Sequence, residues 1–229
     1  MNSPIEQSVG SARRHGASRA VLCGLAVATC LSTLAVQPSV ASAAPIVAKS
    51  PVIRNDPLAI VATEALADLQ TLGVSTSADV RSRFTATRDS LATAIAARVG
   101  VDPARMIQAW ADADQQHQEA LLAALAQLGV SYRRNMSMAG VGFDCSGLTA
   151  HAWGLAGVEL AHQSRTQINS TAPRSFDTAQ AGDLVYYPGH ISMYLGVDMT
   201  IVHSPNTGRT VEVSQIRKGK RVSFSDPAG

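Results

Sequence analysis

The hydrophobic pattern of the sequence changes at Gly129, and this change divides the chain into two parts. Before it, apolar residues recur every three or four positions, which is typical of amphipathic helices. We expect helices over 56–73 and 78–98, and a longer one over 103–128 with a possible break near 113–115. After Gly129, short apolar runs alternate with glycine and proline, which indicates strands and turns. Most aromatic residues also lie in this second part, so we expect the function there.

The helical stripes of the first part are interpreted as core. A stripe of this kind buries one face of a helix and leaves the opposite face to water. His117 lies on such a stripe, and we interpret it as a packed histidine rather than a ligand. The residues expected to be buried are Leu58, Val61, Leu66 and Leu69, then Val80, Phe84, Leu91 and Ile95, and then Met106, Trp110, Ala113, His117, Leu121, Leu125 and Leu128.

The first 43 residues have the pattern of a secretory signal peptide. Three arginines precede an apolar segment over 20–36, and Ala-Ser-Ala at 41–43 supplies a cleavage site. The alternative is a membrane anchor, but the segment is marginal in length for a span and is followed by Pro38. We therefore expect an exported protein, secreted or associated with the cell wall, in which 44–55 is a linker. The export route stays open.

Charge and cysteine content bear on the possible partners. Residues 1–43 carry three of the 19 basic and one of the 17 acidic residues, so the remainder holds 16 of each and is formally neutral. A chain without excess positive charge gives no reason to expect nucleic acid as a partner. Cys145 is the one cysteine left after cleavage, so it cannot form an intramolecular disulfide. It is a buried apolar residue, an intermolecular bridge or a reactive thiol. The cysteine and histidines are not spaced as a ligand set, and we expect no metal or organic cofactor.

Cys145 is expected at the start of a helix. Asp144 is suited to cap that helix, which places Cys145 in the first turn, where unpaired N–H groups and the helix dipole favour a thiolate. The negative charge of Asp144 opposes this effect modestly. Spacing alone leaves a structural and a catalytic thiol equally open. Gly157 is expected to end the helix, and its buried face is expected to include Leu148, Ala152 and Leu155.

A strand pair is expected to bring two histidines together. The segments 183–188, 190–196 and 200–204 read as successive strands. If Leu195 pairs with Thr200, His190 and His203 become diagonal neighbours on one face, within about 7–8 Å at the backbone. Burial of the alternate apolar residues fixes this register, since a slip by one residue would turn them to the other face. These apolar residues are Ile191, Met193 and Leu195.

Four motifs in order resemble those of the NlpC-type (NlpC/p60) cell-wall cysteine peptidases, including the actinobacterial Rip-like endopeptidases. They are Phe143-Asp-Cys-Ser-Gly-Leu148, Ala181-Gly-Asp-Leu-Val-Tyr-Tyr187, Gly189-His-Ile-Ser-Met-Tyr-Leu-Gly196 and Ile201-Val-His-Ser-Pro205. The resemblance implies a papain-like α+β fold, with helices packed on an antiparallel sheet, over 115–229. A small helical region over 56–114 would precede this domain. Members of the family hydrolyse an amide bond in peptidoglycan stem peptides, typically between D-Glu and diaminopimelate.

The resemblance also implies roles for individual residues. Cys145 falls on the nucleophile, His190 on the general base and His203 on the residue that orients the base. Tyr132 falls on a tyrosine near the oxyanion site, although the residues after it depart from the family pattern.

Further positions fall near the expected substrate cleft. Asp144 and Ser146 match residues that line it, although a cap and a first-turn residue also explain them. Ser164, with His162 and Arg165 beside it, lies in a loop that either contacts substrate or is solvated.

Several alternatives follow from these expectations. The first function is an exported cysteine endopeptidase that acts on stem peptides. The others are a non-catalytic wall-binding or regulatory module on the same fold, and a papain-like amidase or acyltransferase. Residues 44–114 either restrain the Cys145 cleft or recruit a cell-wall enzyme, or they are a packing spacer. The oligomeric state stays open.

Overall fold

The described chain begins with four helices, and its strands all follow them. The structure is a computed structural model that describes residues 56–229, so the predicted signal peptide and linker lie outside the described residues. Among residues 56–229, no helix is both long and apolar enough to cross a membrane. The first four helices are α1 (Pro57–Leu72), α2 (Ala78–Val99), α3 (Pro103–Asp112) and α4 (Gln115–Leu125).

Side-chain caps explain where these helices begin. Asp56, Ser77, Asp102 and Asp114 each accept a hydrogen bond from a backbone N–H of the first turn. The segment 103–128 is therefore not one helix, because Ala113 is extended and Asp114 starts a new helix. The break lies where the sequence predicts one.

Burial confirms most of the expected stripes. The stripe from Met106 to Leu128 is buried throughout, as are Phe84, Leu91 and Ile95, whereas Val80 is only partly buried. The stripe expected on α1 is wrong in part. Its most buried residues are Ala59, Ala62, Ala65 and Leu69, with Leu58, Val61 and Leu66 at the margin of the core. Because α1 packs against both α2 and α4, its small residues let the helices approach closely.

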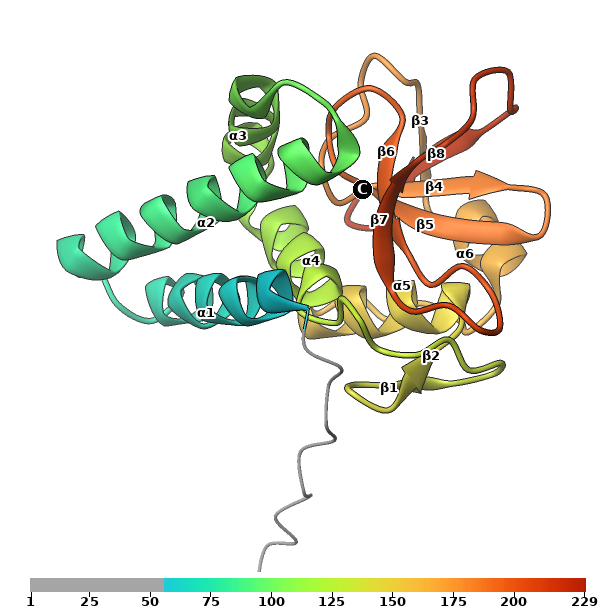
Figure 1. Ribbon diagram of the computed structural model, residues 1–229, viewed down its shortest axis with the longest axis horizontal. Helices are drawn as coiled ribbons and strands as arrows, with labels where there is room; N and C mark the ends of the chain where they lie inside the picture. The colour runs from blue at the N-terminus through green and yellow to red at the C-terminus, as the bar shows by residue number, and fades with distance from the viewer. Residues whose placement is uncertain (1–55) are drawn as a thin grey trace, which may run out of the picture. The chain divides into compact units, whose positions relative to one another are not determined.

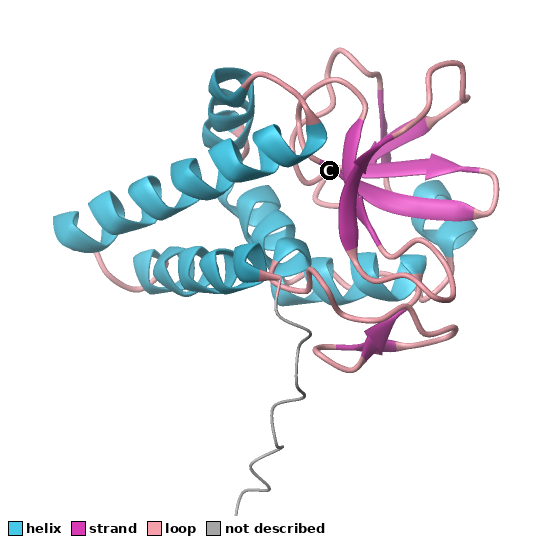
Figure 2. Ribbon diagram, viewed as in Figure 1, coloured by secondary structure: helices cyan, strands magenta, loops and turns pink. Residues whose placement is uncertain are grey.

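The remaining elements are the strands of a six-stranded sheet, a separate two-stranded sheet of β1 and β2, and helices α5 and α6 (Figures 1 and 2). They are β1 (Ser137–Met138), β2 (Gly142–Phe143), α5 (Cys145–Leu155), α6 (Ser164–Ser170), β3 (Ala172–Arg174), β4 (Leu184–Tyr187), β5 (His190–Tyr194), β6 (Thr200–His203), β7 (Glu212–Gln215) and β8 (Ser223–Asp226). The main sheet has six strands in the order β3-β8-β4-β5-β6-β7, and every neighbouring pair is antiparallel. The expected papain-like α+β fold is confirmed.

The expected register of β5 and β6 is also confirmed. Met193 pairs with Val202, and the N–H of Leu195 donates to the carbonyl of Thr200 over 3.0 Å. Both faces of β5 are buried. Ile191, Met193 and Leu195 belong to the core beneath the helices, and Tyr194 packs with Phe224 on the opposite face.

Helix α5 departs from its expected buried face at one position. Leu148 and Ala152 are buried as expected, but Leu155 is 45% exposed. Trp153 instead points into the core and donates from its ring N–H to the carbonyl of Gly182. Gly157 follows the helix with a positive φ of 84°, consistent with its expected place as terminator.

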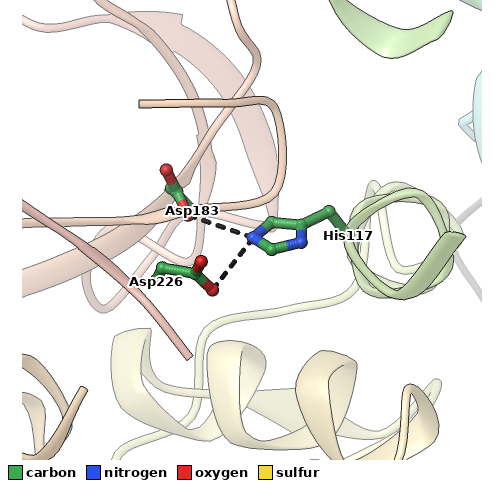
Figure 3. A group of neighbouring side chains, drawn as sticks. All are labelled: His117, Asp183 and Asp226. Carbon is green, nitrogen blue, oxygen red and sulfur yellow. Dashed lines mark hydrogen bonds and ion pairs between the residues drawn. The ribbon is translucent and has the colours of Figure 1, made fainter. Parts of the chain in front are cut away.

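The helices and the sheet share one hydrophobic core. It extends without interruption from Ala59 on α1 to Val211 beside β7. Polar contacts also join the helices to the strand region. The ring N–H of Trp110 donates to the carbonyl of Leu195, and His117 on α4 contacts Asp183 and Asp226 (Figure 3). The division into 56–114 and 115–229 stays a prediction.

Candidate active site

Cys145 is the first residue of α5. Asp144 caps the helix, and its Oδ1 accepts from the N–H of Gly147 over 2.7 Å. The start of α5 packs closely on the preceding loop, because a Cβ added to Gly147 would lie 2.1 Å from the carbonyl oxygen of Met136. The thiol is partly buried, and the backbone N–H of Ile191 faces it. Cys145 is thereby placed beside the beginning of β5, where His190 lies.

Burial keeps the thiol of Cys145 protonated. Desolvation raises the pKa of Cys145, and the charge of Asp144 raises it further, while the N–H groups of Ile191 and of the first turn act in the opposite direction. The expectation that the helix start favours a thiolate is therefore outweighed by burial. Cys145 needs a base to become a nucleophile.

His190 and His203 form the hydrogen-bonded pair expected from the strand register. Nε2 of His190 lies 2.9 Å from Nδ1 of His203, and the two rings are nearly perpendicular. Behind them, Nε2 of His203 lies 3.1 Å from Oγ of Ser214 and 3.6 Å from a carboxylate oxygen of Glu212. Arg209 holds Glu212 through two hydrogen bonds.

Sequence reasoning missed Ser214 and Glu212. Both belong to β7, in which Glu212 and Ser214 alternate with apolar residues, and β7 pairs with β6 so that Glu212 lies opposite His203. The alternating polar residues of β7 can be seen in the sequence. The pairing of β7 with β6 cannot be predicted in the same way, because a loop separates the two strands. A predicted pairing of these two strands would have found both residues.

The ring nitrogens of His190 and His203 share one hydrogen bond, and its direction depends on the tautomers of the two rings. In the tautomer in which Nε2 of His190 donates to Nδ1 of His203, Nδ1 of His190 keeps its lone pair and Nε2–H of His203 faces Ser214 and Glu212. Burial, followed by the charge of Lys220, lowers the pKa of His190 to about 4. Burial, His190 and Arg209 lower the pKa of His203 to about 3. His190 is therefore a neutral base at neutral pH.

Asp144 connects α5 with two loops. Its Oδ1 also accepts from Oγ of Ser146 over 3.1 Å and lies 2.8 Å from Nε2 of His162, while its Oδ2 accepts from the N–H of Asn135 over 2.8 Å. From the sequence, His162 was expected either to contact substrate or to lie in a solvated loop. In the structure its side chain contacts Asp144. The carboxylate is thus engaged on both oxygens, and Ser146 is turned toward it.

Tyr132 and Ser164 differ in their relation to the site. Tyr132 forms an isolated β-bridge with Phe143, two residues before Cys145, and burial raises the pKa of its phenol. Ser164 begins α6, whose cap is Gln163. The hydrogen bonds of the described residues do not connect the Ser164 side chain to Cys145, His190 or His203.

One group of described residues has the composition of metal ligands (Figure 3). Nε2 of His117 lies 3.1 Å from Oδ1 of Asp183 and 3.2 Å from Oδ1 of Asp226, and all three side chains are buried. Arg174 pairs with Asp226, and Asp114 contacts the other ring nitrogen of His117. Burial alone would lower the pKa of His117, but bonds to Asp183 and Asp114 and their charges raise it. The group is a polar cluster that joins α4 to β4 and β8.

Two adjoining pockets lie on the sheet face that carries the histidine pair. The inner pocket, of about 310 Å³, is lined by His203, Glu212, Ser214 and Tyr187 among others. The outer pocket, of about 670 Å³, is lined by residues that include Phe176 and Phe224. Arg217 and Lys220 line both pockets, so these two cations separate them.

Part of the chain is similar to known proteins. Residues 129–222 match the model of the NlpC/P60 family. The chain is 36% identical over 81 residues to peptidoglycan endopeptidase RipA of Mycolicibacterium smegmatis, which covers 34% of this chain and 16% of RipA. It is 38% identical over 88 residues to peptidoglycan endopeptidase RipB of Mycobacterium tuberculosis, which covers 37% of this chain and 36% of RipB.

A solved structure is also similar. RipD of Mycobacterium tuberculosis, described as a non-catalytic NlpC/p60 domain protein adapted to peptidoglycan binding, matches with a TM-score of 0.42 and 24% identity. The match covers 50% of this chain and 98% of that one. The chain thus spans well under two thirds of the two endopeptidases that it resembles in sequence.

Proposed function

We propose that the protein is a cysteine endopeptidase that hydrolyses an amide bond in peptidoglycan stem peptides, because residues 129–222 match the NlpC/P60 family model. One observation carries the proposal. The thiol of Cys145 lies at a helix start beside β5, and His190 is held there by hydrogen bonds that run through His203 to Ser214. A partly buried thiol, a neutral imidazole and an orienting polar group are the parts that thiol-based acyl transfer needs.

The proposed reaction runs in two steps. Nδ1 of His190 takes the thiol proton, and the sulfur of Cys145 attacks the amide carbonyl carbon. His190 then gives the proton to the departing amine nitrogen, the C–N bond breaks, and the acyl group stays on sulfur as a thioester. In the second step His190 takes a proton from water, and the oxygen attacks the thioester carbon. The C–S bond then breaks, the acyl group leaves as the carboxylic acid, and the sulfur of Cys145 takes the proton back from His190. His203 keeps the tautomer of His190 throughout.

Finer features belong to the same proposal. The scissile bond joins D-Glu to diaminopimelate, and Tyr132 stands near the developing oxyanion, where a donor stabilises charge. The enzyme acts outside the cytoplasmic membrane, secreted or in the cell wall. The names of RipA and RipB, both peptidoglycan endopeptidases, support the substrate class.

The test is digestion of a defined muropeptide, followed by mass analysis of the products. Wild type is compared with Cys145→Ala and His190→Ala, with circular dichroism to confirm folding. We expect a product mass for cleavage after D-Glu with wild type and none with either variant, because nucleophile and base act as a unit. Near-wild-type turnover by a folded Cys145→Ala would overturn the mechanism.

The alternatives give other outcomes in the same experiment. A non-catalytic module, as RipD is described to be, would bind insoluble peptidoglycan and release no product. An amidase would release the whole stem peptide, and an acyltransferase would join the acyl group to an added amine. A complete set of Cys145, His190 and His203 favours the endopeptidase over the non-catalytic module.

A further inference from the structure

The connection between β7 and β8 carries a cluster of positive charge. Within residues 216–222 the basic residues are Arg217, Lys218, Lys220 and Arg221. None of them forms a salt bridge with a carboxylate of residues 56–229. The mechanism described above uses none of these charges as a reacting group. Free cations beside a catalytic centre are available for an anionic part of the substrate.

Lys220 contacts the aromatic ring that lies beside His190. Its Nζ is 3.7 Å from the centroid of the Tyr187 ring, and this ring lies 5.0 Å from the ring of His190 at an angle of 31°. The aromatic face holds the ammonium in place without neutralising its charge. The same charge contributes, after burial, to the low pKa of His190. A substrate group at this position would meet a positive charge one ring away from the base.

The pockets on either side of Lys220 suit an amphipathic ligand. Arg217 and Lys220 stand between the inner pocket beside His203 and the outer pocket, which adds Lys218. The outer pocket also has apolar walls, among them Phe176, which is 49% exposed. A chain with a carboxylate and aliphatic carbons fits such a lining better than a purely polar ion does.

We propose that Lys220, with Arg217 beside it, binds the free α-carboxylate of the D-Glu residue and so selects stem peptides in which this group is not amidated. This inference rests on the proposed function and names a determinant of its specificity. The α-carboxylate belongs to the residue that supplies the scissile carbonyl, so it must lie near the catalytic imidazole during attack. Amidation removes its negative charge and leaves the cations of the connection without a partner.

The test uses two stem peptides that differ only in carrying D-Glu or its α-amide. The quantity compared is the ratio of kcat/KM for the acid to kcat/KM for the amide. We expect wild type to favour the acid by about tenfold or more, as a charge-assisted bond permits. Lys220→Gln is expected to bring the ratio close to one. Arg221→Gln is the matched control, because Arg221 belongs to the same connection but lines neither pocket, and it should keep the wild-type ratio.

Binding to an inactive protein separates this proposal from the proposed function. In the Cys145→Ala background, calorimetry measures the affinity for both peptides with and without Lys220→Gln. Preferential binding of the acid that Lys220→Gln removes, in a protein whose wild type does not cleave, would contradict the proposed function alone. Cleavage by wild type with equal ratios for wild type and Lys220→Gln would overturn the role of Lys220 and leave the peptidase.

Discussion

At the scale of single residues, burial decides the protonation of the reacting groups. It raises the pKa of Cys145 and lowers the pKa of His190, so both are neutral near pH 7. The two shifts have one cause, since a low dielectric disfavours the charged form of either group. In the proposed mechanism, the proton of the thiol therefore moves to His190 during the attack on substrate.

The activity should consequently persist into acid solution. His190 accepts a proton only as the pH falls toward its pKa of about 4, so kcat/KM should stay level from pH 7 to about 5 and then fall. A pH–rate profile on a defined muropeptide, with circular dichroism at each pH, measures this. An acid limb centred near 6.5, the ordinary value for histidine, would contradict the buried neutral base.

The groups behind His190 should matter less than His190 itself. His203→Ala is expected to lower kcat by on the order of 10- to 100-fold, below the 10²–10⁴-fold typical of a lost general base, because water can replace an orienting group in part. Glu212→Gln should cost less again, since Ser214 still contacts His203. Single-turnover rates for folded variants give the order, and a loss with His203→Ala as complete as with Cys145→Ala would assign His203 a direct chemical role.

The sequence predicted the histidine pair but not its surroundings. Alternation along β5 and a turn of fixed length were enough to place His190 beside His203. The contacts of Asp144 with Asn135 and His162 join loops, and no period in the sequence relates such segments. Local patterns therefore predicted the histidine pair and the helix start at Cys145, while tertiary packing supplied the groups that contact them.

At the scale of elements, two glycines of α5 occupy opposite environments. A Cβ at Gly147 would lie 2.1 Å from the carbonyl oxygen of Met136 and 2.9 Å from Nε2 of His162, whereas a Cβ at Gly154 would meet nothing within 4 Å. We expect Gly147→Ala to lower the free energy of unfolding by about 1–3 kcal/mol through overpacking, and to lower activity because the start of α5 shifts.

Gly154→Ala is the control for that substitution. It should stabilise the protein by up to about 1 kcal/mol, since alanine favours a helix over glycine. Urea denaturation of both variants measures the two changes. Equal effects of the two substitutions would show that the start of α5 is not tightly packed.

Helix starts were predicted well where a capping residue marks them. The buried faces of the helices were predicted less well. Asp56-Pro57 and Asp102-Pro103 predict helix starts, and α1 and α3 begin at these prolines. The buried face of α1 was harder to predict, because large residues dominate a hydrophobic pattern. Close packing of α1 between α2 and α4 selects alanines instead, and that choice depends on helices that the local sequence does not describe.

At the scale of the whole molecule, His117 fastens the helices to the sheet. It contributes to the stability of the fold because Asp183 and Asp114 raise its pKa, although burial alone would lower it. A raised pKa stabilises the fold fully below the unfolded value of about 6.5, and this contribution is lost as the pH rises through the folded value. His117→Gln should therefore lower the melting temperature most in mildly acid solution, by a difference that narrows toward alkaline pH.

Thermal melts of wild type and His117→Gln from pH 5.5 to 9 check this sign. Gln118→Ala is a comparison on the same helix, since Gln118 is not one of the three residues in the buried cluster. A gap between wild type and His117→Gln that widens with pH would mean that His117 acts as a neutral group.

The position of β8 in the sheet has a consequence for the order in which the sheet can form. This strand, over Ser223–Asp226, is the last strand of the described residues, yet it lies between β3 and β4 rather than at an edge. It also brings Asp226 to His117. Strand β3 joins the rest of the sheet only through β8, which is more than 40 residues away along the chain. Closure of the sheet therefore depends on a contact between distant segments, and such contacts form late in folding.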